Sequence, residues 1–134
     1  MREMKFRAWD YDNECMYDDS QIIIHGGTVF IGKIKYINQI SQDTELMQFA
    51  GLKDKNGVDI YEGDILGRCF DDYDENCVVK YKSGMLILET VRTKATRPCN
   101  IDRGFGWSEL NNYHHYRNGF EVIGNIYKNP KLMQ

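Results

Sequence analysis

Short runs of alternating apolar and polar residues, separated by clusters of turn-forming residues, recur along this chain. Alternation with a period of two is typical of strands that are buried on one face. These runs outnumber any sustained pattern with a period of 3.6 residues. The sequence therefore predicts a mainly β protein with at most one or two short helices. The candidate helix spans residues 107–114, with Ser108 as its N-cap.

The first 45 residues predict an N-terminal β extension. Strands are expected at residues 4–9 and 14–17, joined by the polar turn 10–13, and this pattern predicts a hairpin. Three consecutive isoleucines then favour a strand over residues 21–25. The pair Gly26-Gly27 offers a two-residue turn into residues 28–31.

Residues 46–66 hold two turn signals between apolar runs. Asn56-Gly57 is a strong hairpin signal, because both residue types tolerate a positive φ. In the second turn, Tyr61 to Asp64, Gly63 can adopt a positive φ and the Asp64 side chain can accept backbone N–H bonds. Such a turn brings a strand sharply onto the core of a small barrel.

Later strands are predicted at residues 65–70, 77–82, 85–91 and 120–127. Residues 85–91 are apolar on both faces, which predicts a central strand covered on both sides. Residues 92–103 are expected to be irregular, with Pro98 as a breaker. Five short strands from residue 46 onward predict a small, strongly bent barrel of the SH3-like kind. The whole chain, residues 1–134, is expected to be one domain with its barrel core at 46–134.

Three ordered motifs, at the start, middle and end of the chain, resemble the YopX family of bacteriophage and prophage proteins. They are MREMKFRAWDYDNECM, GLKDKNGVDIYEGDIL and FEVIGNIYKNPKL. The resemblance implies a small β-rich protein carried by phage genomes, with no established activity and no catalytic residues to transfer. We interpret the motif residues as structural. They are Phe6, Arg7, Trp9, Asp10, Gly51, Leu52, Lys53, Asp54, Gly57, Tyr61, Glu62, Gly63, Asp64, Gly124, Asn125, Tyr127 and Pro130.

Composition limits the partners, the cell compartment and the cysteine chemistry that can be expected. The formal net charge of −3 gives no reason to expect nucleic-acid binding from charge alone. No apolar run is long enough to span a bilayer, and the N-terminus lacks the apolar region of a signal peptide, so the cytoplasm of the bacterial host is expected. The four cysteines include no C-x₂-C pair, which argues against zinc and favours free, mostly buried thiols. They are Cys15, Cys69, Cys77 and Cys99.

No pattern of residues predicts a catalytic centre, a metal or a cofactor. The acidic residues 71–75 resemble the start of a calcium loop, but Cys77 and Ser83 stand where glycine and glutamate are needed. A solvated hairpin loop is the better interpretation. The adjacent pair His114-His115 points in divergent directions on a helix or a strand, so the two cannot easily share one ion.

Two features predict binding. Basic residues gather between positions 80 and 103, near aromatic residues, and small barrels bind single strands with such a groove. An ordinary solvated strand pair and loop is the preferred interpretation of this segment. The N-terminal extension is apolar and needs a cover, which favours a homo-oligomer. The alternative is a monomer in which the extension folds back on its own barrel. The leading hypothesis is a non-enzymatic phage accessory protein that acts by protein binding or oligomeric assembly. The alternative is a nucleic-acid-binding module that uses Lys80, Lys82, Arg92, Lys94, Arg97 and Arg103.

Overall fold

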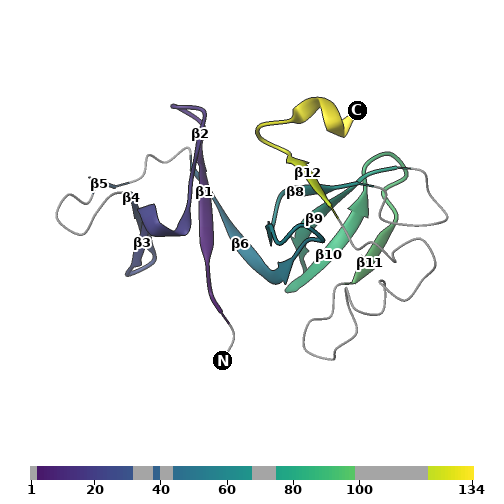
Figure 1. Cartoon of the computed structure of the whole chain (residues 1–134). Coiled ribbons are helices and arrows are strands. Elements are labelled where there is room, and N and C mark those ends of the chain that lie inside the picture. The colour runs from purple at the N-terminus through teal and green to yellow at the C-terminus, as the bar shows by residue number, and fades with distance from the viewer. Residues whose placement is uncertain (1–2, 32–37, 40–43, 68–74, 99–120) are drawn as a thin grey trace. The chain divides into compact units, whose positions relative to one another are not determined.

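The computed structural model describes residues 3–31, 38–39, 44–67, 75–98 and 121–134. These ranges are built of strands, and their helical segments are two short 3-10 turns (Figure 1). The chain divides into two compact units, Met1–Phe49 and Ala50–Gln134. The prediction of a mainly β fold is confirmed, whereas the prediction that the whole chain is one domain stays a prediction.

The first unit contains two antiparallel sheets. In one, β1 (Phe6–Asp10) lies between β2 (Cys15–Tyr17) and the first part of β6 (Thr44–Lys53). After the 3-10 turn η1 (Asp19–Gln21), β3 (Ile22–His25), β4 (Thr28–Ile31) and the two-residue β5 (Asn38–Gln39) form the other. Both hairpins expected from the sequence are present.

Among the described residues of the first unit, the buried side chains come from β1 and β6. They are Ala8 and Trp9 on β1 and Met47 and Phe49 on β6, together with the carboxylate of Asp10. The ammonium group of Lys5 lies 4.7 Å from the centroid of the Phe49 ring, in cation–π geometry. The hairpin of β3 and β4 contributes no buried side chain to this unit.

The second unit is built around a five-stranded antiparallel sheet with the order β11-β10-β9-β8-β12. The last part of β6 pairs with β7 (Asp59–Tyr61), which precedes these strands in the chain. The 3-10 turn η3 (Pro130–Met133) follows the last strand. The five strands, in chain order, are β8 (Asp64–Leu66), β9 (Cys77–Lys82), β10 (Met85–Thr90), β11 (Thr96–Pro98) and β12 (Val122–Asn125). The curled sheet is that of a small bent barrel, as the sequence predicted.

Apolar side chains cover both faces of this sheet. Cys77 and Val79 belong to one buried cluster, whereas Val78 belongs to a second cluster with Ile65 and Val91. The first cluster is larger and consists of Ala50, Ile60, Leu66, Cys77, Val79, Leu86 and Leu88. The strand predicted at 77–82 is therefore confirmed, and its residues alternate between the two clusters. β10 is an interior strand of the sheet with buried side chains on both faces, at Leu86, Ile87 and Leu88, as the sequence predicted.

Two expectations about this unit are wrong. The described residues from 44 onward form seven strands, β6 to β12, not five, because the Tyr61–Asp64 turn separates β7 from β8 and β11 was not foreseen. Pro98 was taken as a breaker, yet it ends β11 opposite Ile87. Because β11 is an edge strand, proline there need not cost a ladder hydrogen bond. The predicted helix 107–114 lies outside the described residues.

The cysteines also differ from expectation. Cys15 is a free thiol, as predicted, but Cys77 is disulfide-bonded and fully buried. The prediction of a free thiol is wrong at Cys77. Sequence spacing shows only whether a known cysteine motif is present, and it does not show which thiols the fold brings together.

Candidate functional sites

The aspartate that ends β1 closes the first hairpin of the chain. One oxygen of the Asp10 carboxylate accepts the backbone N–H groups of Asp12 and Asn13, at 2.9 and 3.1 Å. The other accepts the Asn13 side chain and the Tyr17 hydroxyl. The side-chain and backbone donors of Asn13 hold the pKa of Asp10 below its ordinary value, against the effect of burial. Both oxygens of the Asp10 carboxylate are therefore used in hydrogen bonds that stabilise this hairpin.

Asp54, in the central motif, joins two distant parts of the second unit. Its Oδ1 accepts the backbone N–H groups of Asn56 and Val58 within the turn. Its Oδ2 accepts the backbone N–H of Val122 on β12 at 3.1 Å. Burial alone would raise the pKa of Asp54, but these three donors and the nearby Lys55 lower it more, so the net pKa shift is downward.

The Tyr61–Asp64 turn has the geometry that the sequence predicted. Gly63 has a φ of +85°, and the Asp64 carboxylate accepts the backbone N–H of Tyr61 at 2.8 Å. The Gly63 N–H donates to the Val79 carbonyl, and its own carbonyl accepts the N–H of Ile126. The turn thus connects β9 with the segment that follows β12.

The closing motif is a compact turn built on two asparagines. The Asn125 Oδ1 accepts the backbone N–H groups of Tyr127 and Lys128, and the Asn129 Oδ1 accepts the N–H of Asn125. The Asn129 amide lies so close to Gly124 that a Cβ there would be 2.5 Å from Asn129 Oδ1. Glycine is required at this position because the neighbour leaves no space for a side chain.

The remaining motif residues lie in or beside strands. Trp9 is buried, Leu52 packs against the larger apolar cluster, and the Lys53 ammonium pairs with Asp59 at 2.7 Å. Gly51 and Gly57 have φ values of +84° and +82°, a region that favours glycine. Phe6, Arg7, Tyr61, Glu62 and Tyr127 are partly buried, and Pro130 begins η3. Every motif residue lies within the described ranges.

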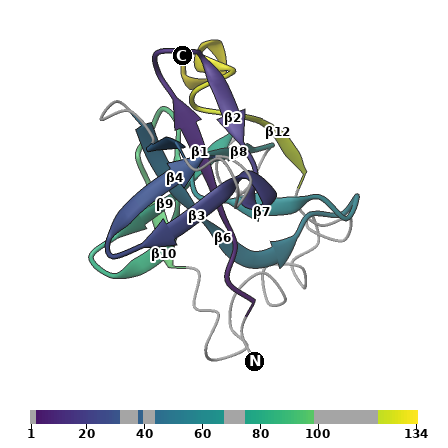
Figure 2. The same cartoon turned by 90° about the vertical axis from the view of Figure 1, so that its left-hand side faces the viewer.

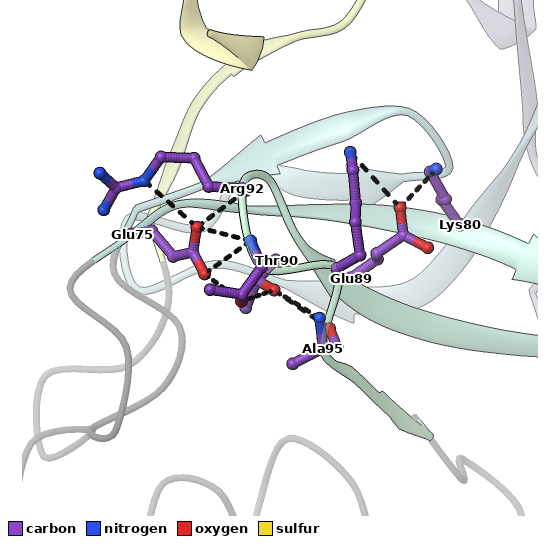
Figure 3. A network of polar contacts seen from close by, with 8 residues as sticks. Glu75, Lys80, Glu89, Thr90, Arg92 and Ala95 are labelled. Atoms are coloured by element: carbon purple, nitrogen blue, oxygen red, sulfur yellow. Dashed lines mark hydrogen bonds and ion pairs between the residues drawn. The ribbon is translucent and has the colours of Figure 1, made fainter.

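Glu75 is the residue whose role the sequence interpretation missed. It was assigned to a solvated loop, but its side chain is only 3% exposed, and its carboxylate holds the turn between β10 and β11 (Figure 3). It accepts the backbone N–H of Arg92 at 2.8 Å, and the backbone N–H and hydroxyl of Thr93. Thr90 extends the network to the N–H of Ala95.

These donors also set the charge state of Glu75. The Thr93 hydroxyl lowers the pKa of Glu75 most, burial opposes it, and the Arg92 and Thr93 backbone N–H groups lower the pKa further. The Arg92 guanidinium, 66% exposed, lies 3.4 Å from the carboxylate. The buried Glu75 carboxylate thus directs its oxygens at backbone N–H groups of the turn between β10 and β11. This arrangement fixes the turn, so Glu75 has the geometry of a structural residue.

Three of the six basic residues of the proposed nucleic-acid surface pair with acidic neighbours. Lys80 and Lys94 both pair with Glu89, at 2.8 and 3.9 Å, and Arg92 pairs with Glu75. Lys80 lowers the pKa of Glu89 most, so Glu89 stays ionised and keeps balancing the lysines. Lys82 is exposed on β9, and Arg97 lies on β11. Arg103 lies outside the described residues.

The hairpin of β3 and β4 presents an unburied aliphatic face. The two strands lie side by side (Figure 2). Their register pairs Ile22 with Ile31 and Ile24 with Val29. Because antiparallel partners project to the same side, these four β-branched side chains share one face. Ile24 is 46% exposed, and the other three are only partly buried. We call these four residues the aliphatic face.

Among the residues that the structure describes, no three His, Cys, Asp or Glu side chains gather in a way that could hold a metal ion. In the same ranges, no helix is both long enough and apolar enough to cross a bilayer.

The fold defines a small β protein in which aspartate and asparagine side chains close the turns. The family model described as YopX protein matches residues 5–134, so the chain belongs to the YopX family, and the resemblance found in the sequence is confirmed. No curated protein matches the chain.

Two solved structures share the fold over their full lengths. Protein EF1440 from Enterococcus faecalis is 26% identical, with a TM-score of 0.60 and complete coverage of both chains. Protein yopX from Bacillus subtilis is 22% identical, with a TM-score of 0.61 and the same coverage. At 22% identity, the similarity to protein yopX supports the fold alone.

Proposed function

We propose that this chain is a non-enzymatic accessory protein of a phage or prophage and that it acts by protein binding or oligomeric assembly. The observation that carries the proposal is the aliphatic face, where one exposed and three partly buried β-branched side chains lie next to one another on a folded hairpin. Contiguous apolar patches on soluble proteins are typical of binding surfaces.

The buried carboxylates support a role without catalysis. Asp10 and Asp54 each accept backbone N–H groups of their own turns, and Glu75 accepts those of the turn between β10 and β11. The pKa of each is lowered, whereas a general base needs a pKa near the working pH. Their geometry and charge suit turn closure.

Nucleic-acid binding stays the second candidate. It depends on the basic residues between positions 80 and 103, and the ion pairs at Glu75 and Glu89 oppose it. Counterion release drives such binding, and a cation already paired with a carboxylate contributes less to it.

Affinity capture with matched variants tests the proposal. Tagged wild-type protein, Ile24→Lys and Val58→Lys would be expressed in bacteria that carry the gene, and retained proteins would be quantified by mass spectrometry. Val58 is a suitable control because it is also an exposed aliphatic residue, 48% against 46%, in the other unit. We expect a protein retained in near-equal amount by wild type and Val58→Lys to be lost with Ile24→Lys. Retention that is indifferent to Ile24 would contradict the proposal.

A further inference from the structure

The segment that leads into β9 runs alongside the start of the turn between β10 and β11. Cys77 begins β9 and pairs with Thr90, the last residue of β10. One residue further along, the carbonyl of Asn76 accepts the backbone N–H of Val91 at 2.9 Å. The residues before Cys77 therefore follow the chain past the end of β10 and into the turn.

The next residue of this segment supplies a side chain to the same turn. The Glu75 carboxylate accepts the backbone N–H of Arg92 (Figure 3) and that of Thr93. We call the contacts of Glu75 and Asn76 with this turn the clamp. Arg92 and Thr93 are exposed, so burial of their own side chains contributes little to holding them, and the clamp fixes their backbone.

A disulfide lies at the end of the clamp. Cys77 is disulfide-bonded and fully buried in the larger apolar cluster. Cys15 is free, so the second sulfur belongs to Cys69 or Cys99, which lie outside the described residues. Along the chain, Glu75 lies between Cys69 and Cys77, and the β10–β11 turn lies between Cys77 and Cys99. A bond to either partner therefore closes a loop that contains one side of the clamp.

A closed loop limits how far the clamp can open. When Glu75 leaves the turn, the released residues gain conformational entropy, and a disulfide reduces this gain because it keeps the ends of the loop together. The open state is therefore less favourable while the bond is intact. Cutting the bond returns this freedom, so the turn, which is exposed, opens at a lower free-energy cost.

The expected setting gives this bond a regulatory meaning. In the reducing cytoplasm that the sequence predicts, disulfides are uncommon, and those that occur are mostly transient and are redox-sensing or catalytic. We propose that the Cys77 disulfide is a redox switch for the clamp. While the bond is intact, Glu75 and Asn76 hold the β10–β11 turn, and reduction releases the segment before Cys77 so that the turn opens more often.

The switch is an exchange between thiols and a disulfide. Two molecules of a low-molecular-weight thiol supply two electrons and two protons, and they leave joined as their own disulfide. The S–S bond of the protein breaks, and its two sulfurs become two thiols. In the reverse direction, a low-molecular-weight disulfide takes up the two electrons and the two protons.

Amide hydrogen exchange of the full chain, measured by NMR, tests the switch without any substitution. Wild type is compared before and after treatment with dithiothreitol, which supplies both thiol groups in one molecule, and intact mass confirms the gain of two hydrogen atoms. After reduction, the N–H groups of Arg92 and Thr93 should exchange several-fold faster. Unchanged exchange at these two residues would overturn the inference.

The N–H of Val122 is the matched control for this measurement. It also donates to a carboxylate, that of Asp54, but both residues lie outside the loop that either partner of Cys77 would close. Its exchange rate should therefore stay the same on reduction. An equal acceleration at Val122 and Arg92 would show that reduction destabilises the whole unit and not the clamp, which would contradict the switch.

The bond itself is tested by peptide mapping of protein purified and alkylated without reductant. Cys77 should be recovered in a disulfide with Cys69 or Cys99, and Cys15 should be alkylated. Four alkylated cysteines would overturn the inference. Cys15→Ser removes the free thiol and should leave the effect of dithiothreitol on Arg92 unchanged. Loss of the effect in this variant would assign it to Cys15 and contradict the switch.

Discussion

The carboxylate of Asp54 accepts the backbone N–H of Val122, 68 residues later, at 3.1 Å. β12 is an edge strand of its sheet. In an interior strand such an N–H would donate to a neighbouring strand, but here it donates to the side chain of Asp54. Edge strands with open N–H groups invite pairing with other chains, and a covering group prevents it. Asp54 therefore closes a turn and blocks a sheet edge with one side chain.

Replacing Asp54 should destabilise the second unit. Asp54→Ala leaves three backbone N–H groups without this acceptor, and an unmade buried hydrogen bond costs about 1–3 kcal/mol. Lys55→Ala is the matched control, because its partner Glu121 is 49% exposed and exposed ion pairs contribute only about 0–1 kcal/mol. Urea denaturation should show a clear loss for Asp54→Ala and little for Lys55→Ala. Equal losses would contradict this role.

The clamp at Glu75 predicts a pH-dependent contribution to stability. Its pKa is lower in the folded chain than its ordinary value of 4.5, so the carboxylate stabilises the fold at pH values above that number. The stabilisation is lost as the pH falls through the lowered folded-state pKa. Glu75→Gln should therefore be less stable than wild type at about pH 7, and the difference should shrink toward about pH 3. A difference in unfolding free energy that is constant with pH would contradict this.

The positive φ of Gly63 predicts a selective response to substitution. Gly63→Val should destabilise the fold by more than about 1 kcal/mol, because a β-branched residue is strained at that φ. Gly63→Asn should be tolerated better, since asparagine adopts this region more readily. Thermal melts of the two variants should therefore separate. An unchanged melting temperature for Gly63→Val, accompanied by lost partner capture, would make the turn functional instead of structural.

The ion pairs at Glu75 and Glu89 predict weak nucleic-acid binding. Fluorescence anisotropy with single-stranded DNA should show little binding at physiological salt, because acidic partners already compensate Lys80, Lys94 and Arg92. Glu89→Gln should raise any residual affinity, since it releases two lysines. Submicromolar affinity for the wild type that falls steeply with salt, and that is abolished by Glu at Lys80, Lys82, Arg92 and Lys94, would favour the alternative function.

Local chemistry explains what could be predicted from the sequence. The strand Cys77–Lys82 and its two faces follow from alternation, and the Gly63 turn follows from the residues that tolerate positive φ. The roles of Asp54 and Glu75 could be found only in part. Asp54 was recognised within a turn motif, but its bond to Val122 depends on how β12 pairs. Glu75 has its donors at Arg92 and Thr93, which the β9–β10 hairpin brings back to it.

The aliphatic face could likewise be predicted only in part. The three isoleucines and Gly26-Gly27 indicate an apolar hairpin from sequence alone. Which side each residue takes depends on the register, and this becomes definite once Ile24 is paired with Val29. The sequence also offered no sign that Pro98 would end a strand, because that outcome depends on β11 being at an edge.

The sheet order of the second unit has a consequence for its folding kinetics. β8 lies between β9, a near neighbour in sequence, and β12, which joins only after the long stretch of chain from 67 to 121 closes into a loop. Closing a long loop costs entropy before any contact compensates for it, and non-local pairing slows folding. The docking of β12 should therefore be a late event, during which one edge of β8 is open to other chains. Refolding at low protein concentration should accordingly give the higher yield.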